Sequence, residues 1–406
     1  MPSSLPEGDS PPADGLLPAT SAQGATSRDM GLYIHVPFCA VRCGYCDFNT
    51  YTAQELEGVS HASYPAQAMA EMTFAADVLK ESGLPPRALS TVFMGGGTPT
   101  LLGASPLATI LERAQNTFGL LPGAEVTVET NPDSVSARDL RDLAQAGVTR
   151  VSLGMQSADP AVLRTLDRTH NPENVPDVIG WAQDAGLQVS LDLIYGTPGE
   201  TLASWEATLA VATQWKPDHL SAYALIVEQG TALAGRIKRG QLPMPDDDLH
   251  AEMYVLADEY LSEAGYHWYE VSNWATSPQH YSRHNRSYWT SEDWWGIGPG
   301  AHSHVGGVRW WNVKHPSAYA SRMTAGASPA FAREVLSAEA SAMERVLLGI
   351  RMREGIAVAD VAPDRSVKLA EWVSRGLIEG RALLEGRIVA TRDGRLVADF
   401  LARELT

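Results

Sequence analysis

Cysteine is almost absent from this sequence: the 406 residues contain three, at positions 39, 43 and 46. A disulfide framework uses an even number of cysteines spread along the chain, so this distribution excludes one. Three thiols within a single loop are typical of metal ligands or redox groups instead. The sequence therefore predicts one centre of sulfur chemistry near its N-terminal end.

Long apolar runs and an excess of positive charge are also missing. No stretch of about 18 apolar residues occurs, so we expect no membrane-spanning helix. The formal net charge is −17 and the pI is near 5.0, which argues against a nucleic-acid partner because such a partner needs a basic face.

Residues 1–30 are rich in Pro, Ser, Ala and Gly. They lack the basic start and the apolar middle of a secretory signal. We expect this segment to form a disordered tail and the protein to be cytoplasmic.

From Gly31 onward, short β-rich runs alternate with amphipathic stretches. Six strands are expected at Leu32–Pro37, Thr91–Met94, Glu125–Glu129, Arg150–Leu153, Gln188–Tyr195 and His219–Leu225. Helical spacing of apolar residues follows at Tyr64–Leu79, Leu107–Phe118, Ala137–Ala146, Val175–Ala185 and Leu202–Thr213. This alternation builds a parallel sheet. Six units rather than eight predict an α/β fold with a partial (β/α)6 barrel over residues 31–230.

Two further regions follow the expected barrel. Residues 231–330 contain a helix at Asp247–Ala264 and an aromatic-rich stretch that ends near Trp311. Residues 331–406 are expected to form helices at Ala338–Met352 and Lys368–Leu377 and then a β-hairpin over Ala382–Ala398, around the turn Arg392-Asp393-Gly394. Two helices and a hairpin resemble a winged-helix module, although no strong basic cluster supports a DNA-binding role.

The strongest chemical signal is the motif Cys39-Ala-Val-Arg-Cys43-Gly-Tyr-Cys46. Three thiolates so close together can reach three corners of one [4Fe–4S] cube, whereas an electron-transfer cluster uses a fourth cysteine that this chain lacks. One iron is then left open to an outside ligand, which is the arrangement needed to bind S-adenosylmethionine (SAM). The alternative is a zinc loop with His35 as fourth ligand, but structural zinc sites usually draw on two separated pairs of ligands.

Polar motifs follow the ends of the predicted strands, at Gly95–Pro99, Glu129–Pro132, Gly154–Ser157 and Asp192–Gly196. Ligands of parallel β/α folds gather at the C-terminal ends of the strands, so we expect these motifs to share one rim with the cysteine loop. Glycines 95–97 let backbone groups approach a ligand that a Cβ would exclude. Candidate partners for an amine, ribose hydroxyls and a carboxylate are Glu129, Gln156, Arg168 and Asp192. Each feature alone is as readily explained by a tight turn or a solvated side chain.

Together these motifs resemble the radical SAM superfamily, and more narrowly its oxygen-independent coproporphyrinogen oxidase-like branch. The resemblance runs from Tyr33 to the C-terminus and rests on Tyr33–Cys39, the cysteine triplet, Gly95–Pro99, Glu129–Pro132, Ser152–Ser157, Arg168 and Asp192–Pro198. It implies that Tyr33 and Tyr45 flank SAM and that Gly96, Gly97 and Thr98 hold its methionine end. It further implies that Glu129, Gln156, Arg168 and Asp192 complete the site, with Ala224 and His302 as further contacts.

Two functions compete within this branch. One is the oxidase, which removes CO₂ from two propionates of coproporphyrinogen III by radical chemistry, and the other is a heme chaperone, which binds heme and passes it to respiratory proteins. The oxidases carry a further cysteine two residues after the triplet, where this chain has Phe48, and a structured N-terminal segment, where it has the Pro-rich tail. Both departures favour the chaperone, while SAM turnover and enzymatic activity stay open.

The segment His284-Asn285-Arg286-Ser287-Tyr288-Trp289 is similar to the heme-binding motif of the chaperones. Imidazole and phenolate are both axial ligands of heme iron, and in a helix His284 and Tyr288 share one face. The alternative is a hydrogen-bonded His284 within a tryptophan-rich core. Further candidates are Arg283 and Arg286 for the propionates, Trp289, Trp294 and Trp295 for stacking, and His302 and His304 as rival ligands.

The resemblance thus implies three cofactors or ligands, which are a [4Fe–4S] cluster, SAM and heme. It also implies a role in porphyrin metabolism and heme-accepting respiratory proteins as partners, some of them membrane-associated. A homodimer linked to the cluster is a further implication, and residues 331–406 are a candidate docking region.

Overall fold

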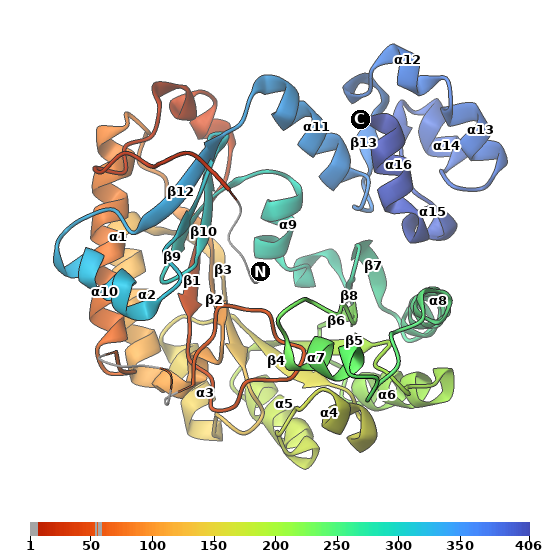
Figure 1. The fold of residues 1–406 in the computed structure, drawn as a ribbon, viewed down its shortest axis with the longest axis horizontal. Coiled ribbons are helices and arrows are strands. Elements are labelled where there is room, and N and C mark those ends of the chain that lie inside the picture. Colours follow the sequence, from red (N-terminus) through yellow and green to blue (C-terminus); the bar gives the residue numbers. More distant parts are fainter. Residues whose placement is uncertain (1–6, 53–54, 56–58) are drawn as a thin grey trace.

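Six parallel strands form the centre of the computed structural model, which describes residues 7–52, 55 and 59–406 (Figure 1). They lie in the order β1-β2-β3-β4-β5-β6, with the bounds Met30–Val36, Leu89–Gly96, Leu120–Thr130, Arg150–Gln156, Gln188–Tyr195 and His219–Ala224. Fully buried apolar side chains such as Leu32, Val92 and Val128 recur along them, as in parallel strands that are covered by helices. The strands and their parallel order confirm the predicted α/β fold.

Helices follow the strands and lie around the outside of the sheet (Figure 1). They are α1 Tyr64–Glu81, α2 Ala104–Phe118, α3 Ala137–Gln145, α4 Pro160–Thr165, α5 Val175–Asp184 and α6 Leu202–Gln214. Buried Leu107, Leu111 and Ala114 of α2 recur at helical spacing, and Ser136 and Asp139 form a reciprocal cap at the start of α3. The five predicted helices are confirmed, and α4 is an additional one.

Six more strands extend the sheet to twelve. Strand β9 (Asp293–Ile297) pairs in parallel with β1. Beyond it, β10 His302–Val305, β11 Val308–Asn312 and β12 Ala330–Val335 are antiparallel to their neighbours, and at the other edge β8 Asn273–Ala275 and β7 His267–Glu270 follow β6. The sheet thus continues to residue 335, whereas the C-terminal region was expected to begin at residue 331.

Four helices belong to the extension of the barrel: α7 Ala232–Lys238, α8 Asp247–Glu263, α9 Arg283–Trp289 and α10 Pro316–Thr324. The N–H groups of Arg283 and His284 at the start of α9 donate to the Glu125 carboxylate, each at 3.0 Å. Glu125 also forms a buried ion pair with Arg150. Because Glu125 belongs to β3 and Arg150 begins β4, these contacts attach the start of α9 to the barrel strands.

Short 3-10 helices connect several of these elements. They span Ala19–Ala22, Ala25–Ser27, Pro99–Leu102, Pro172–Asn174, Pro278–His280 and Val358–Asp360. In the part of the chain that the structure describes, no helix is both long enough and apolar enough to cross a membrane.

Residues 7–29 do not form the predicted disordered tail, and residues 1–6 lie outside the described residues. The main chain of Asp9 pairs with that of Arg333 on β12, through N–H···O bonds of 2.8 and 2.9 Å. The Arg28 guanidinium forms an ion pair of 2.9 Å with the buried Asp293 carboxylate. The Pro-, Ser-, Ala- and Gly-rich composition suggested disorder, but a main-chain pairing attaches the segment to the edge strand β12 and an ion pair attaches it to β9.

The C-terminal part is a mostly helical unit with its own apolar cluster, which includes Ile350, Leu369, Trp372 and Leu401 (Figure 1). Its elements are α11 Ala338–Gly349, β13 Ile356–Ala357, α12 Pro363–Ser366, α13 Leu369–Ser374, α14 Gly380–Leu384, β14 Arg387–Ile388, α15 Arg392–Leu396 and α16 Ala398–Leu405. Helices α11 and α13 correspond to the two that were predicted.

The hairpin predicted over Ala382–Ala398 is wrong. Strand β14 pairs with β13, and Arg392 begins helix α15. The Thr391 hydroxyl caps that helix by accepting the N–H of Gly394 at 3.1 Å. An ideal Cβ on Gly394 would lie 1.9 Å from the Leu377 carbonyl oxygen. Glycine is thus present because α15 closely approaches the main chain that follows α13, and not because of a hairpin turn.

Candidate functional site

The three cysteines lie in a loop that follows β1. The N–H of Cys39 donates to the Tyr51 carbonyl at 3.0 Å, which closes the loop at its base. In the middle of the loop, the Gly44 N–H donates to the Leu166 carbonyl at 3.0 Å and the Gly44 carbonyl accepts from Leu233 at 2.8 Å. The main chain beside the thiols is thus anchored to the end of α4 and to α7. All three thiols are free and half-buried.

The donor chemistry of this loop fits an iron–sulfur cluster better than a single zinc ion. Among the described residues, no three His, Cys, Asp or Glu side chains are arranged to hold one metal ion. His35, the alternative fourth ligand, is engaged at both ring nitrogens: Nδ1 lies 3.0 Å from the Tyr33 hydroxyl and Nε2 lies 2.8 Å from the Asn49 carbonyl. Three thiols that line one cavity match a cube that is held by one thiolate per iron.

The glycine run at the end of β2 packs on the cysteine loop. An ideal Cβ on Gly97 would lie 2.3 Å from the carbonyl oxygen of Phe38, the residue before Cys39. The backbone N–H groups of residues 96–98 all donate within the protein, at 2.7–2.9 Å. These amides are therefore occupied, and what the run can offer to the amine of a ligand is its carbonyl oxygens.

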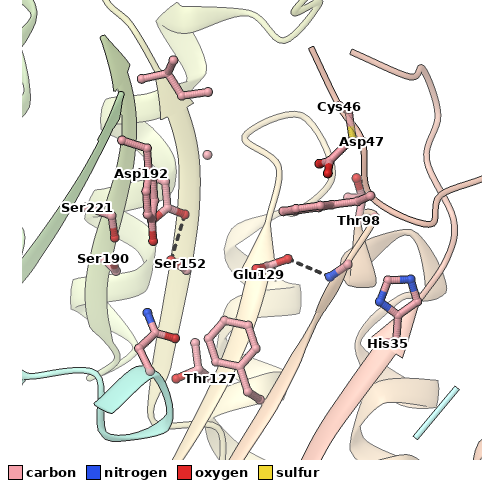
Figure 2. Close-up of a pocket in the computed structure, with 18 of the residues that line it drawn as sticks. His35, Cys46, Asp47, Thr98, Thr127, Glu129, Ser152, Ser190, Asp192 and Ser221 are labelled. Carbon is pink, nitrogen blue, oxygen red and sulfur yellow. Dashed lines mark hydrogen bonds between the residues drawn. The ribbon is translucent and has the colours of Figure 1, made fainter. Parts of the chain in front are cut away.

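Two carboxyl groups, from Glu129 on β3 and Asp192 on β5, face the same cavity (Figure 2). Glu129 accepts the Gly96 N–H at 2.9 Å, and Asp192 accepts the Ser152 hydroxyl at 2.9 Å. Burial, and then the charge of Asp192, raise the pKa of Glu129 to about 7. Burial also raises the pKa of Asp192. Two buried carboxylates that repel each other are stabilised by a cationic ligand, such as one that carries the ammonium and sulfonium groups of SAM.

Arg168 connects the cysteine loop to β4. Its Nη1 donates to Cys43 Sγ at 3.6 Å and its Nη2 donates to the Gly154 carbonyl at 2.9 Å. An ideal Cβ on Gly154 would lie 2.9 Å from Arg168 and from the Gln156 amide, so a side chain at this position would displace both. Gln156 has a φ of 66°, a left-handed conformation that is uncommon outside glycine and that is found at ligand sites.

One cavity of about 1090 Å³ brings these groups together. Its wall includes the three cysteines and every residue that the resemblance implies for SAM, namely Tyr33, Tyr45, Gly96, Gly97, Thr98, Glu129, Gln156, Arg168, Asp192, Ala224 and His302. The volume exceeds the upper end of ordinary small-molecule pockets, which is about 1,000 Å³. The cavity therefore has room for more than SAM alone.

Polar side chains in the interior of the barrel were not predicted as part of the site. Figure 2 shows Ser152, Ser190 and Ser221 around Asp192, and Ser190 is hydrogen-bonded to the His219 ring at 2.8 Å. The signal was present in the sequence, because these residues alternate with apolar ones along β4, β5 and β6, and alternate residues of a strand face the same side. They give the cavity a hydrophilic wall.

His284 and Tyr288 both line the cavity, and α9 places them one helical turn apart, as predicted. The Nε2 of His284 lies 2.7 Å from the Tyr288 hydroxyl, and its Nδ1 lies 2.8 Å from Thr91 Oγ1. Burial lowers the pKa of His284 to about 3, so its ring is neutral. The pair is thus a buried hydrogen-bonded unit, and ligation of a heme iron by His284 Nε2 or by Tyr288 requires this bond to open.

Of the side chains predicted to contact a porphyrin beside this pair, Trp294 lines the cavity. Trp295 is buried and packs edge-on against Trp310. Arg286 forms an ion pair of 2.9 Å with Glu354. Trp294 is therefore the tryptophan best placed to contact a guest.

Acidic side chains outnumber basic ones in the described cavity wall. The acidic residues are Asp47, Glu129, Asp133, Asp192, Glu228 and Glu344, and the basic residues are Arg150, Arg168 and Arg309. Each arginine already has a partner, in Glu125, Cys43 and Glu344 respectively. The cavity consequently favours a neutral or cationic guest over one that carries several carboxylates.

Comparison with known proteins connects this geometry to a family. Residues 33–212 match the model of the radical SAM superfamily. The chain is 46% identical over 379 residues to the heme chaperone HemW of Mycobacterium tuberculosis (strain CDC 1551 / Oshkosh), which covers 93% of this chain and 95% of the relative. It is 32% identical over 379 residues to the heme chaperone HemW of Bacillus subtilis (strain 168), with 90% and 96% covered.

A solved structure shares the fold. Coproporphyrinogen III oxidase (HemN) from Escherichia coli, a radical SAM enzyme, superposes with a TM-score of 0.80 at 21% identity, over 95% of this chain and 92% of that structure. The two sequence relatives are more similar in sequence, and each covers at least 90% of this chain. The superfamily recognised from the motifs is thereby confirmed: the chain belongs to the radical SAM superfamily and, within it, to the family of the heme chaperone HemW.

Proposed function

We propose that the three cysteines hold a [4Fe–4S] cluster whose fourth iron binds SAM. The thiols share their cavity with Glu129, Gln156, Arg168 and Asp192, which supports this assignment and that of the other predicted SAM residues. When bound, such a cluster supplies an iron that is open to the amine and carboxylate of SAM, together with an electron. The carboxylates of Glu129 and Asp192 attract the positive charges of SAM, whereas Arg168 balances the thiolate of Cys43.

The protein is, on this proposal, a heme chaperone that binds heme and passes it to respiratory proteins. The observation that carries the proposal is the close relationship to proteins named heme chaperone HemW, which extends over 95% of the M. tuberculosis relative. The cavity supports it, because about 1090 Å³ leaves space beside SAM for the apolar face of a second guest. The sequence motif indicates His284 and Tyr288 as candidate heme ligands, and either could bind the iron only if the hydrogen bond between them opened.

The location and the partners of the protein follow from the same proposal. We place the protein in the cytoplasm and in porphyrin metabolism, with heme-accepting respiratory proteins, some of them membrane-associated, as recipients. A homodimer linked to the cluster and a docking role for residues 331–406 complete the proposal. The acidic net charge of −17 favours partners with a basic face at the contact.

Oxygen-independent coproporphyrinogen III oxidase is the second candidate, because the fold of HemN is shared. Two observations weigh against it. Phe48 occupies the position of the additional oxidase cysteine and lines the cavity. The acidic wall described above is a poor receptor for coproporphyrinogen, whose four carboxylates need several free cations. The N-terminal departure counts for less than predicted, because residues 7–29 are folded, although they do not contribute to the described cavity wall.

A pair of assays on one preparation tests the proposal. Protein reconstituted with iron and sulfide without oxygen is titrated with hemin, and a Cys43→Ser variant serves as the control for cluster-dependent chemistry. We expect saturable heme binding by difference spectroscopy and no conversion of coproporphyrinogen III in the presence of SAM and a reductant. Catalytic formation of protoporphyrinogen would establish the oxidase instead, and the lack of saturable heme binding would exclude the chaperone.

A further inference from the structure

Histidine is a common axial ligand of heme. The ring nitrogen that binds the iron must have no hydrogen-bond partner in the protein and must face the cavity. Both ring nitrogens of His35, His219 and His284 are hydrogen-bonded to protein groups. The described wall of the cavity contains six histidines in all, which are His35, His170, His219, His284, His302 and His304. Three of the six are therefore already engaged on both sides.

Two of the remaining histidines are also poorly suited to bind iron. The Nδ1 of His170 accepts a hydrogen bond from Arg168 at 3.1 Å, and its Nε2 is buried and inaccessible to a ligand. The Nε2 of His302 is buried as well, and the His302 ring stacks on Trp311 with a centroid distance of 5.8 Å. The Nδ1 of His302 lies next to its own Cβ, where the approach of a flat macrocycle is hindered by the backbone.

His304 differs from the other five. Its Nδ1 lies 2.8 Å from the carbonyl oxygen of Glu292, so Nδ1 carries the proton and Nε2 presents a lone pair. Among the described residues, Nε2 has no hydrogen-bond partner. Metal-binding histidines usually show this arrangement, because a carbonyl that holds one nitrogen fixes the tautomer and aims the other nitrogen at the metal. Burial also lowers the pKa of His304, which keeps the ring neutral and able to ligate.

The part of the cavity wall around His304, here called the slot, is formed by residues of β9, β10, β11 and α11. The strand register places Trp294 of β9 opposite His304 on one side and Arg309 of β11 opposite it on the other. The ring centroids of Trp294 and His304 are 5.1 Å apart. From helix α11, Leu347 and Leu348 contribute to the same cavity wall. An aromatic side chain, aliphatic side chains from α11 and one imidazole thus line the same cavity.

Charge at the edge of this slot is balanced by two ion pairs of Arg309, which connect β11 to α11 and to β12. Arg309 pairs with Glu344 of α11 and with Glu334 of β12, each at 2.5 Å. A propionate can compete for Arg309 only by displacing one of these carboxylates. The propionates of a guest are therefore better accommodated toward water, with the apolar edge of the macrocycle directed inward.

From these observations we propose that heme binds in the slot between β9–β11 and α11, with His304 Nε2 as an axial ligand of its iron. The inference rests on the proposed heme-binding function and names the site for it. It assigns to His284 a positioning role, because its bonds to Thr91 and Tyr288 connect β2 to α9. Trp294 and Leu348 contact the macrocycle on this assignment.

The experiment compares heme complexes of the full-length protein and of the variants His304→Ala, His284→Ala and His302→Ala. Hemin is titrated into each, the complexes are reduced, and resonance Raman spectroscopy records the iron–histidine stretch. We expect His304→Ala alone to lose this band and to bind heme at least tenfold more weakly. Added imidazole should restore a histidine-like spectrum to His304→Ala, because it fills the space left by the side chain.

Three outcomes separate the inference from the function on which it rests. An unchanged band in His304→Ala, or its loss in His284→Ala with His304→Ala intact, would overturn the assignment and leave the chaperone function standing. The lack of saturable heme binding by the unsubstituted protein would overturn both. Circular dichroism checks that each variant is folded, and His304→Gln, which retains a polar side chain but no imidazole, replaces His304→Ala should the latter not fold.

Discussion

Gly97 lies against the main chain that leads into the cysteine loop, and a substitution there tests how tightly the glycine run holds that loop. An alanine Cβ would come within 2.3 Å of the Phe38 carbonyl oxygen, whereas a Cβ on Gly180 of α5 would meet nothing within 4 Å. We expect Gly97→Ala to destabilise the protein by about 2 kcal/mol and Gly180→Ala to stabilise it slightly, because alanine favours a helix by up to about 1 kcal/mol. Urea unfolding measures both. Equal effects would show that the contact at Gly97 is relieved without cost.

Glu129 gives the site a pH dependence that can be measured by binding alone. Its pKa is raised to about 7, chiefly by burial, so the carboxylate that we propose attracts the SAM ammonium is lost to protonation as the pH falls below that value. We expect the affinity of the cluster-loaded protein for SAM to fall below pH 7, by at most about tenfold per pH unit, and to be level above it. Equilibrium dialysis from pH 5.5 to 8.5 measures this.

The matched variant for this prediction is Glu129→Gln, which has no ionisable group at that position. It should bind SAM more weakly at pH 8 and show a flatter profile. A profile as steep as that of the unsubstituted protein would assign the pH dependence to another group, with Asp192 as the first candidate.

At the scale of elements, a buried carboxyl on α1 connects three other segments behind the site. Glu71 accepts hydrogen bonds from the Gly298 N–H at 2.7 Å, the Asn312 amide at 2.8 Å and the Tyr319 hydroxyl at 2.5 Å. It thereby links α1 to β11, to α10 and to the turn after β9. Burial raises the pKa of Glu71 from 4.5 to about 7.

The sign of the resulting stability change follows from this shift. The native protein keeps the proton of Glu71 up to about pH 7, while the unfolded chain releases it above about pH 4.5. The stabilisation is therefore complete below pH 4.5 and is lost as the pH rises through 7, by at most about 1.4 kcal/mol per pH unit. We expect Glu71→Gln to flatten the free energy of unfolding between pH 5 and 8. Glu81→Gln, at an exposed position of the same helix, should not, and an unchanged slope in Glu71→Gln would contradict the account.

The elements differ in how far the sequence predicted them. The six barrel strands were predicted because each is a buried apolar run that ends in a polar motif. The Gly95–Pro99 and Asp192–Gly196 motifs lie at the same rim, as expected for the ends of parallel strands. Partners far apart in the chain were not found. Nothing local in residues 293–297 indicates that they pair with β1, or that Asp9 pairs with Arg333. Local sequence signals also gave a wrong prediction where tertiary contacts determine the conformation. The Arg392-Asp393-Gly394 segment was predicted as a hairpin turn, but its conformation depends on its contact with Leu377.

The candidate site shows the same limit. Gln156 was predicted because its motif lies at the end of a strand, whereas Arg168, which follows helix α4, was predicted from the family resemblance. His304 was predicted as a rival heme ligand, but its open ring nitrogen was not, because that depends on the carbonyl of Glu292, which folding brings next to it. The alternative of a hydrogen-bonded His284 was foreseen, but its partners Thr91 and Tyr288 were identified only by the structure.

At the scale of the whole molecule, a buried ion pair joins the C-terminal unit to the barrel. Arg395 of α15 donates to both carboxylate oxygens of Asp258 on α8, at 3.1 and 2.7 Å, and its guanidinium lies 4.2 Å from the Trp268 ring centroid. We expect Arg395→Ala to cost roughly 3 kcal/mol, because it leaves the Asp258 carboxylate buried without its partner. Arg392→Ala removes an exposed pair with Glu259 on the same two helices and should cost less than about 1 kcal/mol.

Thermal unfolding and limited proteolysis measure the two arginine variants. The loss of Arg395 should expose cleavage sites within residues 338–406 before the barrel unfolds, since this pair connects the two parts. Similar stability of both variants would mean that the C-terminal unit is held mainly by its apolar contacts.

The most direct test of the central claim is the electron paramagnetic resonance spectrum of the reduced, anaerobically reconstituted protein, recorded with and without SAM. The account predicts about four iron and four sulfide ions per chain and a [4Fe–4S] signal that SAM alters, because one iron has no thiolate from the protein. The signal should be lost when Cys46 is replaced by serine. Stoichiometric zinc in place of iron, or a cluster signal that SAM leaves unchanged, would contradict it.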